Sequence, residues 1–138
     1  MTTPSKGTIL VVDDEEATLL LINQILSSAG YEIFTVRNGK EVMDMALDVQ
    51  PQLILLDVIL PDIPGLEVLQ QIKLNPETQN CFVVLMSSFL FSKDEQSVSI
   101  EAGADGYILK PFQNRELVTR VEAFMRHKTT IEKLKKSE

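Results

Sequence analysis

The stretch PQLILLDVILPDIPG, residues 51–65, decides the fold because it contains a strand without a polar face. Leu53 to Leu56 are all apolar, and the strand ends on the carboxylate of Asp57. Strands that are apolar on both faces belong to parallel sheets that helices cover on both sides. Aspartate also suits turns, so the rest of the chain decides whether Asp57 carries chemistry.

The alternation of a strand and a helix occurs five times along the chain. Apolar runs of strand length are followed by segments with apolar residues at helical spacing. The pattern predicts an α/β fold with a doubly wound, five-stranded parallel sheet of the flavodoxin-like (βα)5 type, in strand order 2-1-3-4-5. The expected strands are 8–14, 31–36, 53–57, 81–88 and 106–111, and the expected helices are 15–30, 42–49, 65–74, 92–102 and one that begins near Gln113.

Length and composition favour one domain in a reducing compartment. A chain of 138 residues can bury an ordinary core without disulfides. The formal net charge of −7 argues against direct binding of nucleic acid, which calls for a basic face. Cys81 is the single cysteine, so we expect neither an internal disulfide nor a zinc site. The N-terminus resembles no signal peptide and the apolar runs are short, so we expect a cytoplasmic protein without membrane contact.

Polar residues gather where the predicted strands end. Asp13 and Asp14 follow the first strand, Asp57 ends the third, Ser87 lies at the end of the fourth, and Lys110 at the end of the fifth. The second strand offers nothing comparable. Because right-handed crossovers place all these ends on one edge, we expect the five side chains to lie close together.

The chemistry of this edge suits a phosphoryl group. Three carboxylates in one place repel one another, and a hard divalent cation such as Mg²⁺ removes that conflict. One carboxylate can then stay ionised and attack a phosphoryl group as a nucleophile. Lys110 could neutralise a phosphoryl oxygen, and the Ser87 hydroxyl could donate a hydrogen bond to another.

These motifs, taken together, resemble the receiver domain of two-component response regulators. The resemblance covers about residues 6–128 and rests on VVDDE (11–15), LLDVILPDIPG (55–65), VLMSS (84–88) and GADGYILKPF (103–112). The intervals also fit, since Ser87 follows Asp57 by thirty residues and Lys110 follows Ser87 by twenty-three.

The resemblance implies a phosphoacceptor module of a two-component system or phosphorelay. Asp57 would accept a phosphoryl group from the phosphohistidine of a sensor histidine kinase or a phosphotransfer protein. Asp13 and Asp14 would hold Mg²⁺ together with Asp57 and the backbone carbonyl of Ile59.

A conformational switch is also implied by the resemblance. Ser87 and Lys110 would contact the attached phosphoryl group, and the Ser87 hydroxyl would move toward it. Tyr107 would turn inward behind Ser87 and reshape the face made by the fourth helix, the fifth strand and the fifth helix. That face is a candidate homodimer interface. The bond before Pro111 is expected to be cis.

Two apolar features depart from what is common in the family. Ile59 and Phe89, two residues after Asp57 and two after Ser87, often have polar counterparts that position an attacking water. We hypothesise that both shield the acyl phosphate and slow its hydrolysis; the alternative is that they merely fill the surface. The run from Phe89 to Phe91 is either a partner or dimer surface or a segment folded back onto the next helix.

We expect residues 1–6 to form an N-terminal tail, residues 7–126 the receiver domain, and residues 127–138 a helical extension or linker. The extension favours a fragment of a longer chain. Asp62 and Glu67 are interpreted as loop and helix-surface acids. Cys81 and His127 are assigned no functional role.

The leading interpretation is a regulatory module, not a metabolic enzyme. The main alternative is a pseudo-receiver that works as a constitutive interaction scaffold, against which the complete set of acids, Ser87 and Lys110 argues. A third alternative, an aspartyl-nucleophile phosphohydrolase, is disfavoured. Such an enzyme usually spaces two acids as Asp-x-Asp after the first strand and needs a base, whereas Asp13 and Asp14 are adjacent and no base is evident. A flavodoxin-type cofactor module needs a phosphate-binding loop after that strand, and the sequence has none.

Overall fold

The computed structural model describes residues 5–88 and 92–136, and in these ranges strands and helices alternate from end to end. The strands are β1 (Thr8–Val12), β2 (Glu32–Val36), β3 (Leu53–Asp57), β4 (Phe82–Ser88) and β5 (Gly106–Lys110). The helices are α1 (Glu16–Ser28), α2 (Val42–Val49), α3 (Gly65–Leu74), α4 (Lys93–Glu101) and α5 (Asn114–Lys136).

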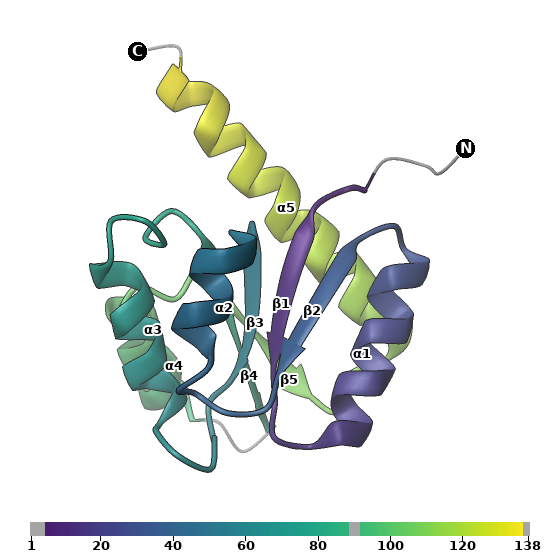
Figure 1. Ribbon diagram of the computed structural model, residues 1–138, viewed down its shortest axis with the longest axis vertical. Helices are drawn as coiled ribbons and strands as arrows, with labels where there is room; N and C mark the ends of the chain where they lie inside the picture. Colours follow the sequence, from purple (N-terminus) through teal and green to yellow (C-terminus); the bar gives the residue numbers. More distant parts are fainter. Residues whose placement is uncertain (1–4, 89–91, 137–138) are drawn as a thin grey trace.

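The strands form one parallel sheet in the order β2-β1-β3-β4-β5, which confirms the predicted fold class and strand order. The order reverses between β1 and β3, which are neighbours although β2 separates them in the sequence (Figure 1). Their register pairs Val12 with Leu56. The residues that directly follow these two, Asp13 just beyond β1 and Asp57 at the end of β3, therefore lie side by side at the edge of the sheet.

Two layers of helices cover the sheet, α1 and α5 on one face and α2, α3 and α4 on the other (Figure 1). The central strand β3 explains why: its four leucine and isoleucine side chains are fully buried, and they alternate between the two cores. Leu53 and Leu55 pack on the α1 and α5 side, whereas Ile54 and Leu56 pack on the α2 and α3 side.

The first strand is shorter than the sequence predicted, ending at Val12 and not at Asp14. The Asp13 N–H still bonds the Val36 carbonyl at 3.2 Å, but the Asp13 carboxylate accepts the Glu15 N–H at 3.0 Å. This local bond turns the chain out of the sheet and toward α1, because a short acidic side chain competes with the strand ladder for backbone donors.

The last helix continues without a break to Lys136, so the expected division after Arg126 falls inside α5. Lys128 is buried and Ile131 packs against the core of the α1 and α5 face. The turns beyond extend away from the sheet (Figure 1). None of the helices in the described ranges is both long and apolar enough to span a membrane.

Candidate functional site

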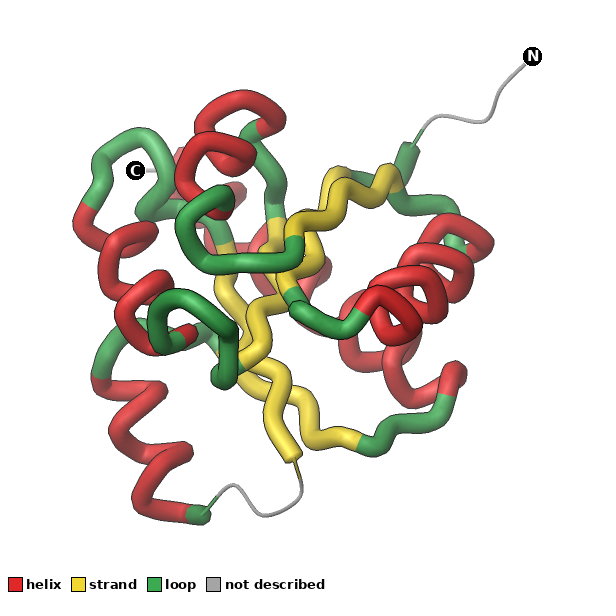
Figure 2. The backbone as a smooth tube through the Cα atoms, turned by 60° about the horizontal axis from the view of Figure 1, so that its bottom comes forward, coloured by secondary structure: helices red, strands yellow, loops and turns green. Residues whose placement is uncertain are grey.

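Three carboxylates meet at the carboxyl ends of β1 and β3, the edge that Figure 2 turns toward the viewer. Oxygen atoms of Asp13, Asp14 and Asp57 all lie within 4.8 Å of one another. Asp13 is almost completely buried, Asp57 is partly buried and Asp14 is exposed. The topological reversal between β1 and β3 creates this juxtaposition, as it does for ligand sites in open α/β sheets.

Lys110 reaches this cluster from β5. Its Nζ donates to Asp13 Oδ2 at 2.6 Å and to Asp57 Oδ2 at 3.1 Å. Burial by itself lowers the pKa of the Lys110 ammonium, but the hydrogen bond to Asp13 and the charge of Asp57 outweigh it and raise that pKa. The ammonium therefore stays charged and offsets part of the negative charge of the cluster. The peptide bond that follows it, to Pro111, is cis.

The Asp57 carboxylate is held in one orientation by two different donors. Oδ1 accepts the N–H of Ile59 at 2.9 Å, and Oδ2 accepts the Lys110 ammonium. Burial nevertheless raises the pKa of the Asp57 carboxyl, against the opposing effects of the Ile59 N–H and Lys110. The ionised form of Asp57 is thus costly to bury, and an additional cation at the edge would favour it.

The structure brings Ser87 to the same edge and places Tyr107 on β5, next to the strand that carries Ser87. Met86 is the register partner of Asp57, so Ser87 lies one residue beyond the acid on the neighbouring strand, and it is buried. Tyr107 pairs with Leu85 and packs partly buried on the α2 and α3 face. Ile59, beside Asp57, is 79% exposed. Phe89 and the apolar run to Phe91 lie outside the described residues.

The second strand, which from the sequence offered nothing comparable to the acids, Ser87 and Lys110, does bring a side chain to this edge. Arg37 directly follows β2, and its guanidinium donates to the Asp14 carbonyl oxygen from Nη2 at 3.0 Å and from Nε at 3.3 Å. The bonds attach the β2–α2 loop to the loop that carries Asp13 and Asp14. A cationic residue at the end of a strand on this edge was the available signal in the sequence.

Asp62 also has a contact that the sequence did not indicate. Its carboxylate bridges the β3–α3 loop and the β2–α2 loop, because it accepts the backbone N–H groups of Gly39 and Lys40, each at 2.8 Å. Glu67, the other acid flanking the site, lies exposed on α3.

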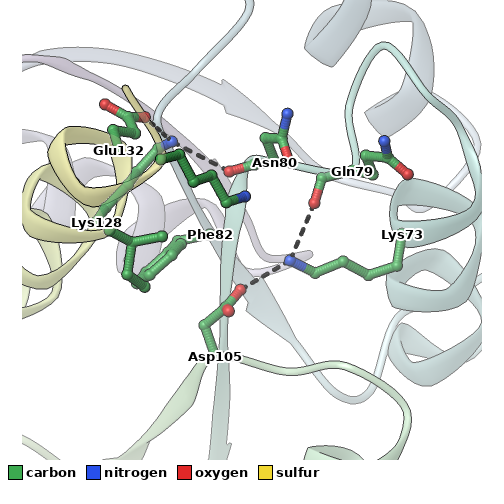
Figure 3. Close-up of a pocket in the computed structure, with 9 residues that line it drawn as sticks. Lys73, Gln79, Asn80, Phe82, Asp105, Lys128 and Glu132 are labelled. Atoms are coloured by element: carbon green, nitrogen blue, oxygen red, sulfur yellow. Dashed lines mark hydrogen bonds and ion pairs between the residues drawn. The ribbon is translucent and has the colours of Figure 1, made fainter. Parts of the chain in front are cut away.

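A second polar cluster lies at the opposite edge of the sheet, around a cavity of about 280 Å³ (Figure 3). Lys73 donates to the Cys81 carbonyl at 2.8 Å and to Asp105 at 2.9 Å. Lys128 donates to the Asn80 carbonyl at 3.1 Å and to Glu132. Each ammonium thus has a carboxylate partner, and Lys128 fastens α5 to the α3–β4 loop.

Cys81, whose carbonyl joins that cluster, is an unreactive thiol at neutral pH. Burial raises the pKa of the Cys81 thiol to about 12, and the side chain is 7% exposed. Since the thiolate is the reactive form, this environment agrees with the interpretation of Cys81 as a core residue.

Comparisons with known proteins agree with this geometry. Residues 9–122 match the family described as "Response regulator receiver domain". The alkaline phosphatase synthesis transcriptional regulatory protein PhoP of Bacillus subtilis is 40% identical over 121 residues, which are 86% of this chain and 48% of PhoP. The polar-differentiation response regulator DivK of Brucella anthropi is 30% identical over 85% of this chain and 94% of its own length. The chain thus spans about half of PhoP and nearly all of DivK.

Solved structures show the same architecture. NtrX from Brucella abortus matches with a TM-score of 0.88 and 28% identity, over 96% of this chain and 30% of the NtrX chain. A response regulator from Chloroflexus aurantiacus matches with a TM-score of 0.82 and 28% identity, over 90% of this chain and 99% of that chain.

Proposed function

Because the chain belongs to the family of response regulator receiver domains, we propose that it is a phosphoacceptor switch of a two-component system. Asp57 accepts a phosphoryl group from the phosphohistidine of a sensor histidine kinase or a phosphotransfer protein. The observation that carries the proposal is the convergence of Asp13, Asp14, Asp57 and Lys110 on one sheet edge. The role is regulatory and not that of a metabolic enzyme.

The donor set at this edge fits Mg²⁺. Three carboxylates within 4.8 Å of one another are hard oxygen ligands, which Mg²⁺ prefers. Asp13, Asp14, Asp57 and the backbone carbonyl of Ile59 would hold the ion. When bound, it neutralises carboxylate and phosphoryl charge at the reacting centre.

Phosphoryl transfer follows from the orientation of Asp57. An Asp57 carboxylate oxygen attacks the phosphorus atom and forms a new P–O bond, while the P–N bond to the donor imidazole breaks and its electron pair stays on the nitrogen. The Ile59 N–H holds Oδ1 and so fixes the plane of the carboxylate. Lys110, already 3.1 Å from Oδ2, donates to an oxygen of the attached phosphoryl group.

The switch acts through Ser87 and Tyr107. The buried Ser87 hydroxyl moves to hydrogen-bond the phosphoryl group, and Tyr107 follows on the neighbouring strand. The face made by α4, β5 and α5 then changes shape. The half-exposed apolar side chains of Val98 and Ile100 on α4 and of Leu109 on β5 make these elements suitable for a homodimer interface.

Two further properties belong to the proposal. The exposed apolar side chain of Ile59 beside the acceptor shields the acyl phosphate and slows its hydrolysis. The working compartment is the cytoplasm, where a reduced Cys81 is stable, and the net charge of −7 makes protein partners more suitable than nucleic acid.

Intact mass spectrometry with the small phosphodonor acetyl phosphate tests the proposal. The wild-type chain with Mg²⁺ should gain one phosphoryl unit, and it should gain none when EDTA removes the metal. The Asp57→Asn variant should gain none in either case. Asp48→Asn, which removes an exposed acid of α2, is the matched control and should react like the wild type. Equal labelling of wild type and Asp57→Asn would contradict the assignment of the acceptor.

A further inference from the structure

We propose that Asp62 is a positioning residue for the magnesium site, because it braces the loop that carries Ile59 against the β2–α2 loop. The inference rests on the proposed function and extends it to a residue outside the acid cluster. The sequence alone indicates that Asp62 is an ordinary loop acid.

The brace consists of two hydrogen bonds that two consecutive backbone amides donate to one carboxylate. Asp62 Oδ1 accepts from Gly39 N at 2.8 Å and Oδ2 accepts from Lys40 N at 2.8 Å. Bonds from backbone amides to a carboxylate are charge-assisted, and the Gly39 amide in particular holds the pKa of Asp62 below its ordinary value. Both oxygens of Asp62 are therefore engaged by the neighbouring loop.

Close packing accompanies these bonds. A methyl group on Gly39 would overlap with Cγ1 of Ile63 and would lie 2.9 Å from Cγ2 of Val68. The β2–α2 loop is thus in direct contact with Ile63, the residue next to Asp62, and only glycine fits at this point. The hydrogen bonds and the packing together fix the distance between the two loops.

The braced segment leads to the proposed metal ligand. The β3–α3 loop is tied at one end by Val58 N to the Met86 carbonyl at 3.1 Å, and at the other by Gly65 N to the Val58 carbonyl at 2.8 Å. Between these ties lie Ile59, whose carbonyl is a proposed ligand, and Asp62. Without the brace, this span would keep the hydrogen bonds at its two ends, the Ile59 N–H bond to Asp57, and the packing of Leu60 and Ile63.

The β2–α2 loop is connected to the other half of the site as well. Arg37, at its start, holds the backbone carbonyl of Asp14. One loop therefore links the segment that carries Asp13 and Asp14 to the segment that follows Asp57. Groups that hydrogen-bond metal ligands directly commonly change metal affinity by about 10–100-fold when they are removed, and Asp62 acts one contact further from the ligands.

The test compares Asp62→Ala and Asp62→Asn with Glu67→Gln. Glu67 is an exposed acid on α3, so its variant removes one nearby negative charge and leaves the brace intact. The dissociation constant for Mg²⁺ is measured by isothermal titration calorimetry, and the rate of phosphorylation by acetyl phosphate is measured across Mg²⁺ concentrations. Urea unfolding monitored by circular dichroism reports the stability of each variant.

Asp62→Ala should weaken Mg²⁺ binding by about tenfold, the lower end of the range for groups that bond the ligands directly. Its phosphorylation rate at saturating Mg²⁺ should stay within about twofold of wild type, because the reacting groups are unchanged. The Mg²⁺ affinity of Asp62→Asn should lie between those of wild type and Asp62→Ala, since a carboxamide keeps one acceptor oxygen. Glu67→Gln should change the Mg²⁺ affinity by less than about twofold, as expected for an exposed charge.

Equal Mg²⁺ affinity in Asp62→Ala and wild type would overturn the inference, and so would a loss that Glu67→Gln reproduces in full. A lower unfolding free energy with unchanged Mg²⁺ affinity would show that Asp62 is merely structural and would also overturn it. These outcomes leave the proposed function standing. That function fails on a different result, namely a wild-type chain that neither binds Mg²⁺ nor gains a phosphoryl group.

Discussion

Replacing Asp57 by asparagine should stabilise the metal-free protein, although it removes an ion pair. Asparagine has the shape of aspartate and can still accept the Ile59 N–H. The substitution removes the ion pair with the Lys110 ammonium, but it also removes the repulsion between Asp57 and the carboxylates of Asp13 and Asp14. Lys110 keeps its bond to Asp13 at 2.6 Å. The sign of the change depends on which of these contributions is larger.

The distances show that attraction and repulsion at Asp57 are of similar size. Two unit charges 4.8 Å apart, the limit within which oxygens of the three carboxylates lie, repel by about 3.5 kcal/mol at an effective dielectric constant of about 20. The attraction of Asp57 to Lys110 at 3.1 Å is about 5 kcal/mol on the same basis. Burial of the ionised carboxylate decides the sign, because it raises the pKa of Asp57 against the opposing effects of the Ile59 N–H and Lys110, and the charge of Asp13 adds a smaller contribution in the same direction. We expect Asp57→Asn to raise the free energy of unfolding by about 1–2 kcal/mol, or the melting temperature by about 3–8 °C.

In the presence of Mg²⁺, wild type should become more stable than Asp57→Asn. Wild type in Mg²⁺ at a hundred times the dissociation constant gains about 2.7 kcal/mol, whereas the variant has one carboxylate fewer and gains less. The pH dependence of stability in the absence of metal also predicts that Asp57→Asn is more stable than wild type. Since burial raises the pKa of Asp57, the wild type loses stability as the pH rises through that raised pKa, and the variant lacks this loss.

Urea unfolding with and without Mg²⁺ is the assay, and Asp48→Asn on α2 controls for the change in net charge. A metal-free Asp57→Asn variant that is no more stable than wild type would refute the charge analysis, provided that Asp48→Asn behaves like wild type. Equal stabilisation of both proteins by Mg²⁺ would refute the part of Asp57 in the metal site.

Two further predictions concern residues on opposite edges of the sheet. Ile59→Asn should shorten the lifetime of the acyl phosphate, by roughly tenfold, because a polar group beside Asp57 can position an attacking water; an unchanged decay in intact-mass time courses would contradict the shielding role. Lys128→Ala should lower the free energy of unfolding by about 1–2 kcal/mol, since it leaves the Asn80 carbonyl and Glu132 without their partner. Phosphorylation at saturating Mg²⁺ should be unaffected, and the exposed Lys136→Ala variant should match wild type in both assays.

The fold and the acid cluster could be predicted because they depend on periodicity and topology alone. A strand such as Leu53–Asp57, apolar on both faces, requires a helical layer on each side. Parallel strands joined by right-handed crossovers then bring Asp13 and Asp57 to one edge. The fold class and the meeting of these acids can therefore be inferred without knowing the conformation of any loop.

The place of Arg37 at the end of a strand is visible in the sequence, but the backbone partners of Arg37 and Asp62 could not be predicted, since side-chain bonds to backbone groups depend on loop conformation. Lys128 shows a different limit. It follows Val121 and Phe124 at helical spacing, but a lysine at an inward position suggests that the packed face has ended. In the structure its aliphatic stem is buried while the ammonium reaches the Asn80 carbonyl.

The central claim is that Asp57 carries the phosphoryl group as an acyl phosphate, and borohydride reduction tests it most directly. Reduction converts an aspartyl phosphate to homoserine, which peptide mass spectrometry places at a single position. After treatment with acetyl phosphate and Mg²⁺, we predict homoserine at position 57, and none when EDTA is present. Homoserine at position 13 or 14, or a phosphoryl group that survives reduction on another residue, would contradict the account.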